Sequence, residues 1–129
     1  MRIVPIVPAL LLSFAAAACA PADADSAPQS RAPAATVVRE GVNCIQSTNI
    51  QNTRVWDDYT IDFHMRNGDV YRNTLPNRCP QLGFEERFAY KTSISQLCGT
   101  DIITVLFSDG QRGASCGLGK FVPVEVEKR

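Results

Sequence analysis

Five cysteines are spread unevenly along this 129-residue chain: Cys19, Cys44, Cys79, Cys98 and Cys116. The last four are separated by 35, 19 and 18 residues, whereas structural zinc sites and thiol redox motifs use cysteines about two to four residues apart. Widely spaced cysteines in a short chain favour disulfides that stabilise a small domain. The sequence alone does not choose between the possible pairings. We expect a nested one, Cys44 with Cys116 and Cys79 with Cys98, which would join the first and last strands and tie a loop to a nearby turn.

Residues 1–18, MRIVPIVPALLLSFAAAA, have the layout of a secretory signal: one basic residue, Arg2, then an apolar run, then small residues. The run is shorter than the roughly 20 residues of a membrane-spanning helix, and Pro5 and Pro8 interrupt it. We therefore expect a cleaved signal peptide and export of the remaining chain.

The stretch Ala16-Ala17-Ala18-Cys19 is similar to the lipobox of bacterial lipoproteins, with Ala16 where leucine is usual. This resemblance implies lipidation of Cys19, which would also account for the unpaired fifth cysteine. Ala20 stands where aspartate would imply inner-membrane retention, so the periplasmic face of the outer membrane is the expected location. The alternative is cleavage by general signal peptidase and a soluble periplasmic protein.

Residues 19–40 are rich in Ala, Pro, Asp and Ser. Such a composition buries too little apolar surface to offset the entropy of ordering a chain. We expect a flexible tether over 19–40 and a single folded domain over 41–126.

The best strand signal is the alternation of apolar and polar residues over 59–65, YTIDFHM, followed by Asn67-Gly68. Asn-Gly favours a two-residue hairpin turn with 70–75 as the return strand. In that register His64 would lie opposite Tyr71, and Asp62 opposite Asn73. All four side chains would then share the face that points away from the core.

Further strands are expected over 87–91, 101–107 and 120–126. A turn at Asp109-Gly110 would place Ile103 opposite Cys116, and Pro123 would mark a sheet edge or a strand end. The chain is thus expected to be mostly β, a small antiparallel barrel or twisted sheet of five to six strands with two disulfides.

The most suggestive group for chemistry is Asp62, His64 and Tyr71, because an acid and a histidine on one face can form a general base. No serine or cysteine nucleophile lies beside them in the expected register, so we expect no enzyme and no catalytic residues. Together with Arg66, Arg72 and Asn73 the three form a candidate binding patch. The adjacent Asp57 and Asp58 should diverge in a turn before the strand.

The 13 basic and 13 acidic residues balance, and neither sign forms a run. This argues against nucleic acid as a partner. We also expect no metal and no cofactor.

The chain resembles a family of small Gram-negative envelope proteins known as a domain of unknown function. The features that carry the resemblance are Asp57-Asp58 before a strand, the Gly-containing hairpin, Tyr71-x-Asn73, Cys79-Pro80-x-Leu82, Cys98 before a long apolar strand, and Ser115-Cys116-x-Leu118-Gly119. The resemblance implies an export signal and a single domain, and no activity.

These observations lead to one functional expectation and one alternative. We expect a lipid-anchored periplasmic β-domain that contacts the membrane through its N-terminal lipid and serves as an interaction or accessory module for an envelope protein partner. The alternative is a secreted inhibitor or ligand-binding protein with an architecture like that of the small lysozyme inhibitors.

Overall fold

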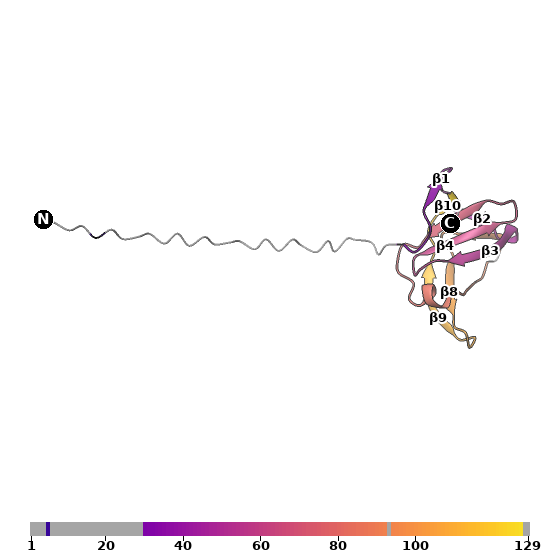
Figure 1. Ribbon diagram of the computed structural model, residues 1–129. Coiled ribbons are helices and arrows are strands. Elements are labelled where there is room, and N and C mark those ends of the chain that lie inside the picture. Colours follow the sequence, from indigo (N-terminus) through magenta and orange to yellow (C-terminus); the bar gives the residue numbers. More distant parts are fainter. Residues whose placement is uncertain (1–4, 6–29, 93, 128–129) are drawn as a thin grey trace.

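The computed structural model describes residues 5, 30–92 and 94–127 (Figure 1). Apart from residue 5, the expected signal peptide lies outside the described residues, and so does Cys19. The described elements are β1 (Ala35–Val37), β2 (Cys44–Gln46), η1 (Ser47–Asn49), β3 (Ile50–Val55), β4 (Thr60–Met65), β5 (Val70–Thr74), α1 (Leu82–Glu85), β6 (Phe88–Tyr90), β7 (Gln96–Cys98), β8 (Ile102–Leu106), β9 (Arg112–Gly117) and β10 (Phe121–Val126).

The strands form three antiparallel sheets, in the orders β1-β10-β5-β4-β3, β2-β7 and β6-β8-β9. The sheets do not close into a barrel. The expected class, mostly β and stabilised by disulfides, is confirmed, with more and shorter strands than the five or six expected.

The β4–β5 hairpin forms at the expected place, but its loop is one residue longer than predicted. The Met65 N–H donates to the Asp69 carbonyl, and the Gly68 N–H donates to the Met65 carbonyl. Gly68 has a φ of 94°, which is the left-handed conformation that glycine adopts most readily. The loop is therefore a three-residue turn of the bulged type.

This extra loop residue changes the strand register, so the predicted pairing is wrong by one position. Asp62 lies opposite Arg72, His64 lies opposite Val70, and Tyr71 lies opposite Phe63. Because side chains alternate between the faces of a strand, the shift moves the side chain at position 71 to the core face.

The β8–β9 hairpin also has a three-residue turn: the Gly110 N–H donates to the Phe107 carbonyl, and the Phe107 N–H to the Gln111 carbonyl. The predicted pairing of Ile103 with Cys116 is nevertheless confirmed. An irregularity further along the strand pair adds one residue to β9 and cancels the effect of the longer turn.

The two disulfides join Cys44 to Cys98 and Cys79 to Cys116, so the nested pairing predicted from the sequence is wrong. Cys44 and Cys98 are directly opposite each other in the β2–β7 pair. Cys116 in β9 packs against the core, where Cys79 is fully buried. The error arose because no pairing between β2 and β7 was expected.

The hydrophobic core lies between the sheets and is centred on aromatic rings. Phe63 contacts Phe121 edge-on at 5.3 Å and Phe88 at 6.2 Å between ring centroids. Every buried member of this core cluster lies at Ile45 or later in the chain.

The tether was predicted to extend to residue 40, but residues 30–38, which precede the core, are part of the folded domain. The predicted domain boundary is therefore corrected. Ala35 pairs with Val126 and Val37 with Val124, so this part of the chain is a strand of the main sheet. Within the described residues, side-chain contacts between this segment and the sheet are present from Ser30 onward.

Pro123 was expected at a sheet edge or a strand end, but it lies within β10, which is placed between β1 and β5. The Pro123 carbonyl accepts a hydrogen bond from the Val38 N–H. In an antiparallel strand the nitrogen and carbonyl of a residue point to the same side. The missing N–H of Pro123 therefore faces Val38, just beyond the last residue of β1.

Candidate functional site

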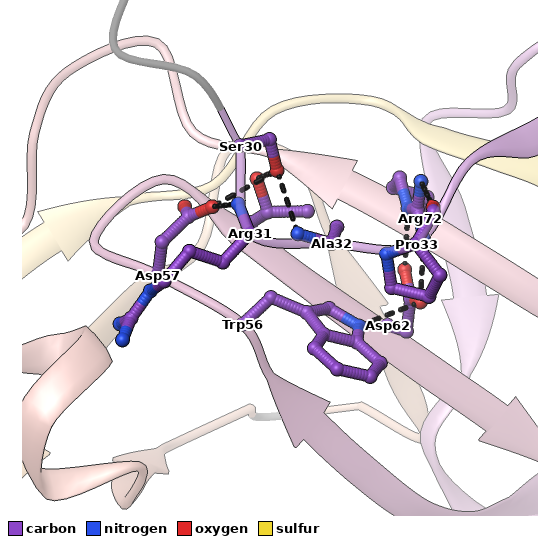
Figure 2. A network of polar contacts seen from close by, with 9 residues as sticks. Ser30, Arg31, Ala32, Pro33, Trp56, Asp57, Asp62 and Arg72 are labelled. Atoms are coloured by element: carbon purple, nitrogen blue, oxygen red, sulfur yellow. Dashed lines mark hydrogen bonds and ion pairs between the residues drawn. The ribbon is translucent and has the colours of Figure 1, made fainter. Parts of the chain in front are cut away.

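Two neighbouring features of the described domain share residues and are candidates for a functional site. The first is a polar network beneath the N-terminal segment, which we define as residues 30–38 (Figure 2). The second is a groove beside α1, lined by Arg31, Asp57, Asp58, Tyr59, Arg78, Gly83, Phe84 and Glu86. Arg31 and Asp57 belong to both features.

The residues of the predicted binding patch do not form one surface. Asp62, His64 and Arg72 share the face of the sheet that points away from the core, and Arg66 lies in the hairpin loop. Tyr71 packs against the core. Asn73 is 0% exposed.

Asn73 has a structural role that the sequence did not indicate. Its Nδ2 donates to the Gly119 carbonyl and its Oδ1 accepts from the Gly119 N–H, both at 2.8 Å. A side chain at position 119 would collide with the Thr74 carbonyl. The amide therefore fixes a close approach of two backbones.

Asp62 is only 1% exposed and forms the centre of the polar network. Its Oδ1 accepts from Arg72 Nε at 2.8 Å, and its Oδ2 accepts from Arg72 Nη2 and from Trp56 Nε1, each at 2.9 Å. Arg72 Nη1 also donates to the Pro33 carbonyl at 2.9 Å. Figure 2 shows this pair beneath the N-terminal segment.

These contacts bear on the predicted pairing of an acid with His64. Both oxygens of Asp62 are bound by Arg72 and Trp56. A carboxylate in a buried, two-point ion pair with arginine is poorly placed to orient an imidazole.

Asp57 fixes the start of the N-terminal segment. Its Oδ2 accepts from Ser30 Oγ at 2.9 Å and from the Arg31 N–H at 3.0 Å, and its Oδ1 accepts from the Tyr59 N–H at 2.8 Å. Burial raises the pKa of the Asp57 carboxyl, but the hydrogen bonds that it accepts lower the pKa more. The result is a pKa below the ordinary value of 3.8.

Asp58 binds the α1 loop, which we define as residues 79–86. Its carboxylate accepts from Arg78 Nε at 2.9 Å and from the Gly83 N–H at 2.8 Å. Asp57 and Asp58 thus bind different partners, although both line the groove.

The α1 loop is held tightly to the domain. Leu82 is fully buried, and Cys79 is tied to β9 by its disulfide. Gln81 and Glu86, on either side of the single helical turn, have φ angles of 70° and 54°. Residues other than glycine reach this left-handed region only at a cost of about 1 kcal/mol or more.

Phe84 projects from this loop with 82% of its surface exposed. The groove beside it has a volume of about 730 Å³. Sequence reasoning missed Phe84, because the surrounding stretch was treated only as an irregular loop. The sequence has two large apolar residues, Leu82 and Phe84, on either side of Gly83. In the structure Leu82 is buried and Phe84 is exposed.

The described residues place no group of three or more His, Cys, Asp or Glu side chains where they could hold a metal ion. In residues 30–92 and 94–127, no helix is long and apolar enough to span a membrane. What the arrangement offers chemically is an exposed aromatic ring beside a groove lined by arginines and carboxylates.

The fold and the site together define a small antiparallel β-domain with two disulfides and an aromatic residue presented on a rigid loop. Comparison of the chain with protein-family models, curated proteins and solved structures finds no match. The family resemblance drawn from the sequence stays a prediction.

Proposed function

We propose that this chain is a non-enzymatic interaction module of the bacterial envelope that binds a protein partner through the groove. In this proposal the chain is exported, Cys19 carries the lipid, and Phe84 is the main contact to the partner. The location is the periplasmic face of the outer membrane.

The observation that carries the proposal is that Phe84 is exposed on a loop whose backbone is held in place. The disulfide at Cys79, the buried Leu82 and the hydrogen bond from Gly83 to Asp58 restrain the loop. Aromatic residues that enter a partner's pocket are common hot spots, and a rigid presentation lowers the entropy cost of binding.

Two further features support export and tethering. Four of the cysteines form disulfides, which persist in oxidising compartments. Since Ser30 contacts the described domain, a lipid on Cys19 would lie no more than about 40 Å from it even with the intervening chain fully extended. The groove would then remain close to the membrane surface.

A non-enzymatic role is supported by the environment of the one group that suggested catalysis. Asp62 is bound by Arg72 and Trp56, and His64 lies opposite the apolar Val70. No step of acid–base chemistry is therefore assigned to these residues.

The test is photo-cross-linking in intact envelopes, with p-benzoylphenylalanine replacing Phe84. The matched control places the same reagent at Ile102, which is 59% exposed but lies on β8. We expect one defined adduct from position 84, absent from position 102 and lost when unlabelled wild-type protein competes. Equal adducts from both positions would contradict binding through the groove.

A secreted inhibitor is the second candidate, because a disulfide-tied loop with a projecting side chain suits insertion into an enzyme's cleft. A lysozyme activity assay tests it directly. The inhibitor hypothesis is favoured if micromolar protein inhibits lysozyme and if inhibition falls at least about tenfold in Phe84→Ala. Such a loss is expected of a hot-spot residue. No inhibition at that concentration would remove it.

A further inference from the structure

The N-terminal segment forms a layer separate from the core. The buried core cluster contains only residues from Ile45 onward. Within 31–40 only Pro33 is buried, and residues 36–40 are all exposed. The segment therefore contributes no residue to the buried hydrophobic cluster.

The segment is held chiefly through its backbone. The Arg31 N–H donates to Asp57, Arg72 donates to the Pro33 carbonyl, and the Glu127 N–H donates to the Ala34 carbonyl at 3.0 Å. Residues 35–37 continue this pairing along β10. A surface that binds an extended chain through main-chain hydrogen bonds is a site of strand addition.

Two side chains of the segment make contacts that an arbitrary extended chain would not make with this surface. Ser30 Oγ donates to Asp57 and lies 3.2 Å from Thr60 Oγ1. Pro33, three residues later, is the buried position of the segment. The surface therefore fits an extended chain with a serine three residues before a proline.

The connection between the segment and the core is short and loosely held. Val38 and Val42 both bond to β10, through the carbonyls of Pro123 and Phe121. The residues between them include Arg39, whose ion pair with Asp69 is 3.5 Å long and exposed. Such an exposed pair contributes little to stability.

We infer that this docking surface, formed by Asp57, Thr60, the Asp62–Arg72 pair and the edge of β10 that pairs with β1, also accepts residues 30–38 of a second copy of this chain. Two copies would exchange their N-terminal strands and keep every contact described above. The second copy is the fitting occupant because its segment has the serine, the proline and the extended backbone that the surface already binds. This inference goes beyond the proposed function and does not depend on lipidation or on Phe84.

The balance between the monomer and the strand-exchanged dimer depends on the protein concentration. A segment on a short linker competes with an effective concentration in the millimolar range, so the wild-type chain is monomeric at micromolar concentration. Exchange becomes visible when each chain's own segment is prevented from docking.

The test uses two full-length variants that complement each other. The acceptor carries Ser30→Ala and Thr36→Pro, which weaken its segment and leave its docking surface intact. The donor carries Asp57→Asn, Trp56→Phe and Glu127→Pro, which weaken its docking surface and leave its segment intact. Trp56 of the acceptor is then the only tryptophan in the mixture.

We expect each variant to be monomeric alone and a one-to-one heterodimer to form on mixing at about 0.1–1 mM, since the contacts are those of one short strand. Native mass spectrometry measures the dimer, and the fluorescence of Trp56 shifts to shorter wavelength. The control is a donor that also carries Ser30→Ala and Thr36→Pro, with which binding falls at least about tenfold.

No heterodimer at about 1 mM, with both variants folded by circular dichroism, overturns the inference. If a variant does not fold, the wild-type chain alone decides. Its dimer must appear as the concentration approaches the millimolar range and must be absent in the single variant Thr36→Pro. A dimer unaffected by Thr36→Pro would also overturn the inference.

Discussion

At the scale of single residues, the fraction of a charged side chain that is exposed decides whether it holds the domain together or is accessible to a partner. The alternation over 59–65 predicted that Asp62 and His64 share one face, and they do. It could not predict that Asp62 is buried, because the cover comes from residues 30–33, some 30 positions earlier in the chain. The patch was predicted from local periodicity, whereas its accessibility depends on a long-range contact.

The Asp62–Arg72 pair gives the first prediction. Arg72→Ala leaves the Asp62 carboxylate buried without its main partner, so we expect a loss of about 3 kcal/mol in the free energy of unfolding, measured in urea. Arg54→Ala is the control, since Arg54 is exposed and stacks on the Trp56 ring from outside, and it should cost less than about 1 kcal/mol. Equal losses in the two variants would contradict a central role for the pair.

Asp57 gives a prediction about pH. Its pKa is lowered in the folded state, so its contribution to stability is complete above the pKa of the unfolded chain and is lost as the pH falls through the folded-state pKa. We expect the stability difference between wild type and Asp57→Asn to be constant near neutral pH and to shrink below about pH 4. Urea unfolding of both proteins across this range measures it. A difference that grows with acidification would contradict the assignment.

At the scale of elements, the sequence predicted the hairpins but not their loop lengths. Asn67-Gly68 suits a two-residue turn and also a three-residue turn with glycine in the left-handed position, and the structure has the second. One residue of difference exchanges the faces of the return strand, which is why Tyr71 was placed wrongly. Nothing in the local sequence distinguishes the two turns, because register depends on which side chains fit the core.

The α1 loop gives a prediction at this scale. A Cβ at Gly83 would lie 2.9 Å from the Asp57 backbone and 2.8 Å from Arg31 Nη2. We expect Gly83→Ala to destabilise the domain by about 1–3 kcal/mol, because the backbone of Asp57 cannot move freely. Gly117→Ala is the matched control, since a Cβ there meets no atom within 4 Å. Thermal unfolding of the two variants measures the difference in stability between them. Equal melting temperatures would contradict a tight contact at Gly83.

At the scale of the whole molecule, the disulfides show the limit of prediction from sequence. The spacing of the cysteines predicted two structural disulfides, and both are present. The pairing depended on β2 and β7, two strands of three residues each that no periodicity reveals. The class of fold followed from strand patterns, while the connections between distant short strands required the structure.

Export into an oxidising compartment is the central claim, and its most direct test is a tryptic mass map of the protein isolated from envelopes without reduction. The four paired cysteines fall in four different tryptic peptides, spanning 40–54, 79–87, 92–112 and 113–120. We predict that 40–54 is linked to 92–112 and 79–87 to 113–120, with an acylated Cys19 at the mature N-terminus. Free thiols at these positions, or peptide 40–54 linked to 113–120, would contradict the account.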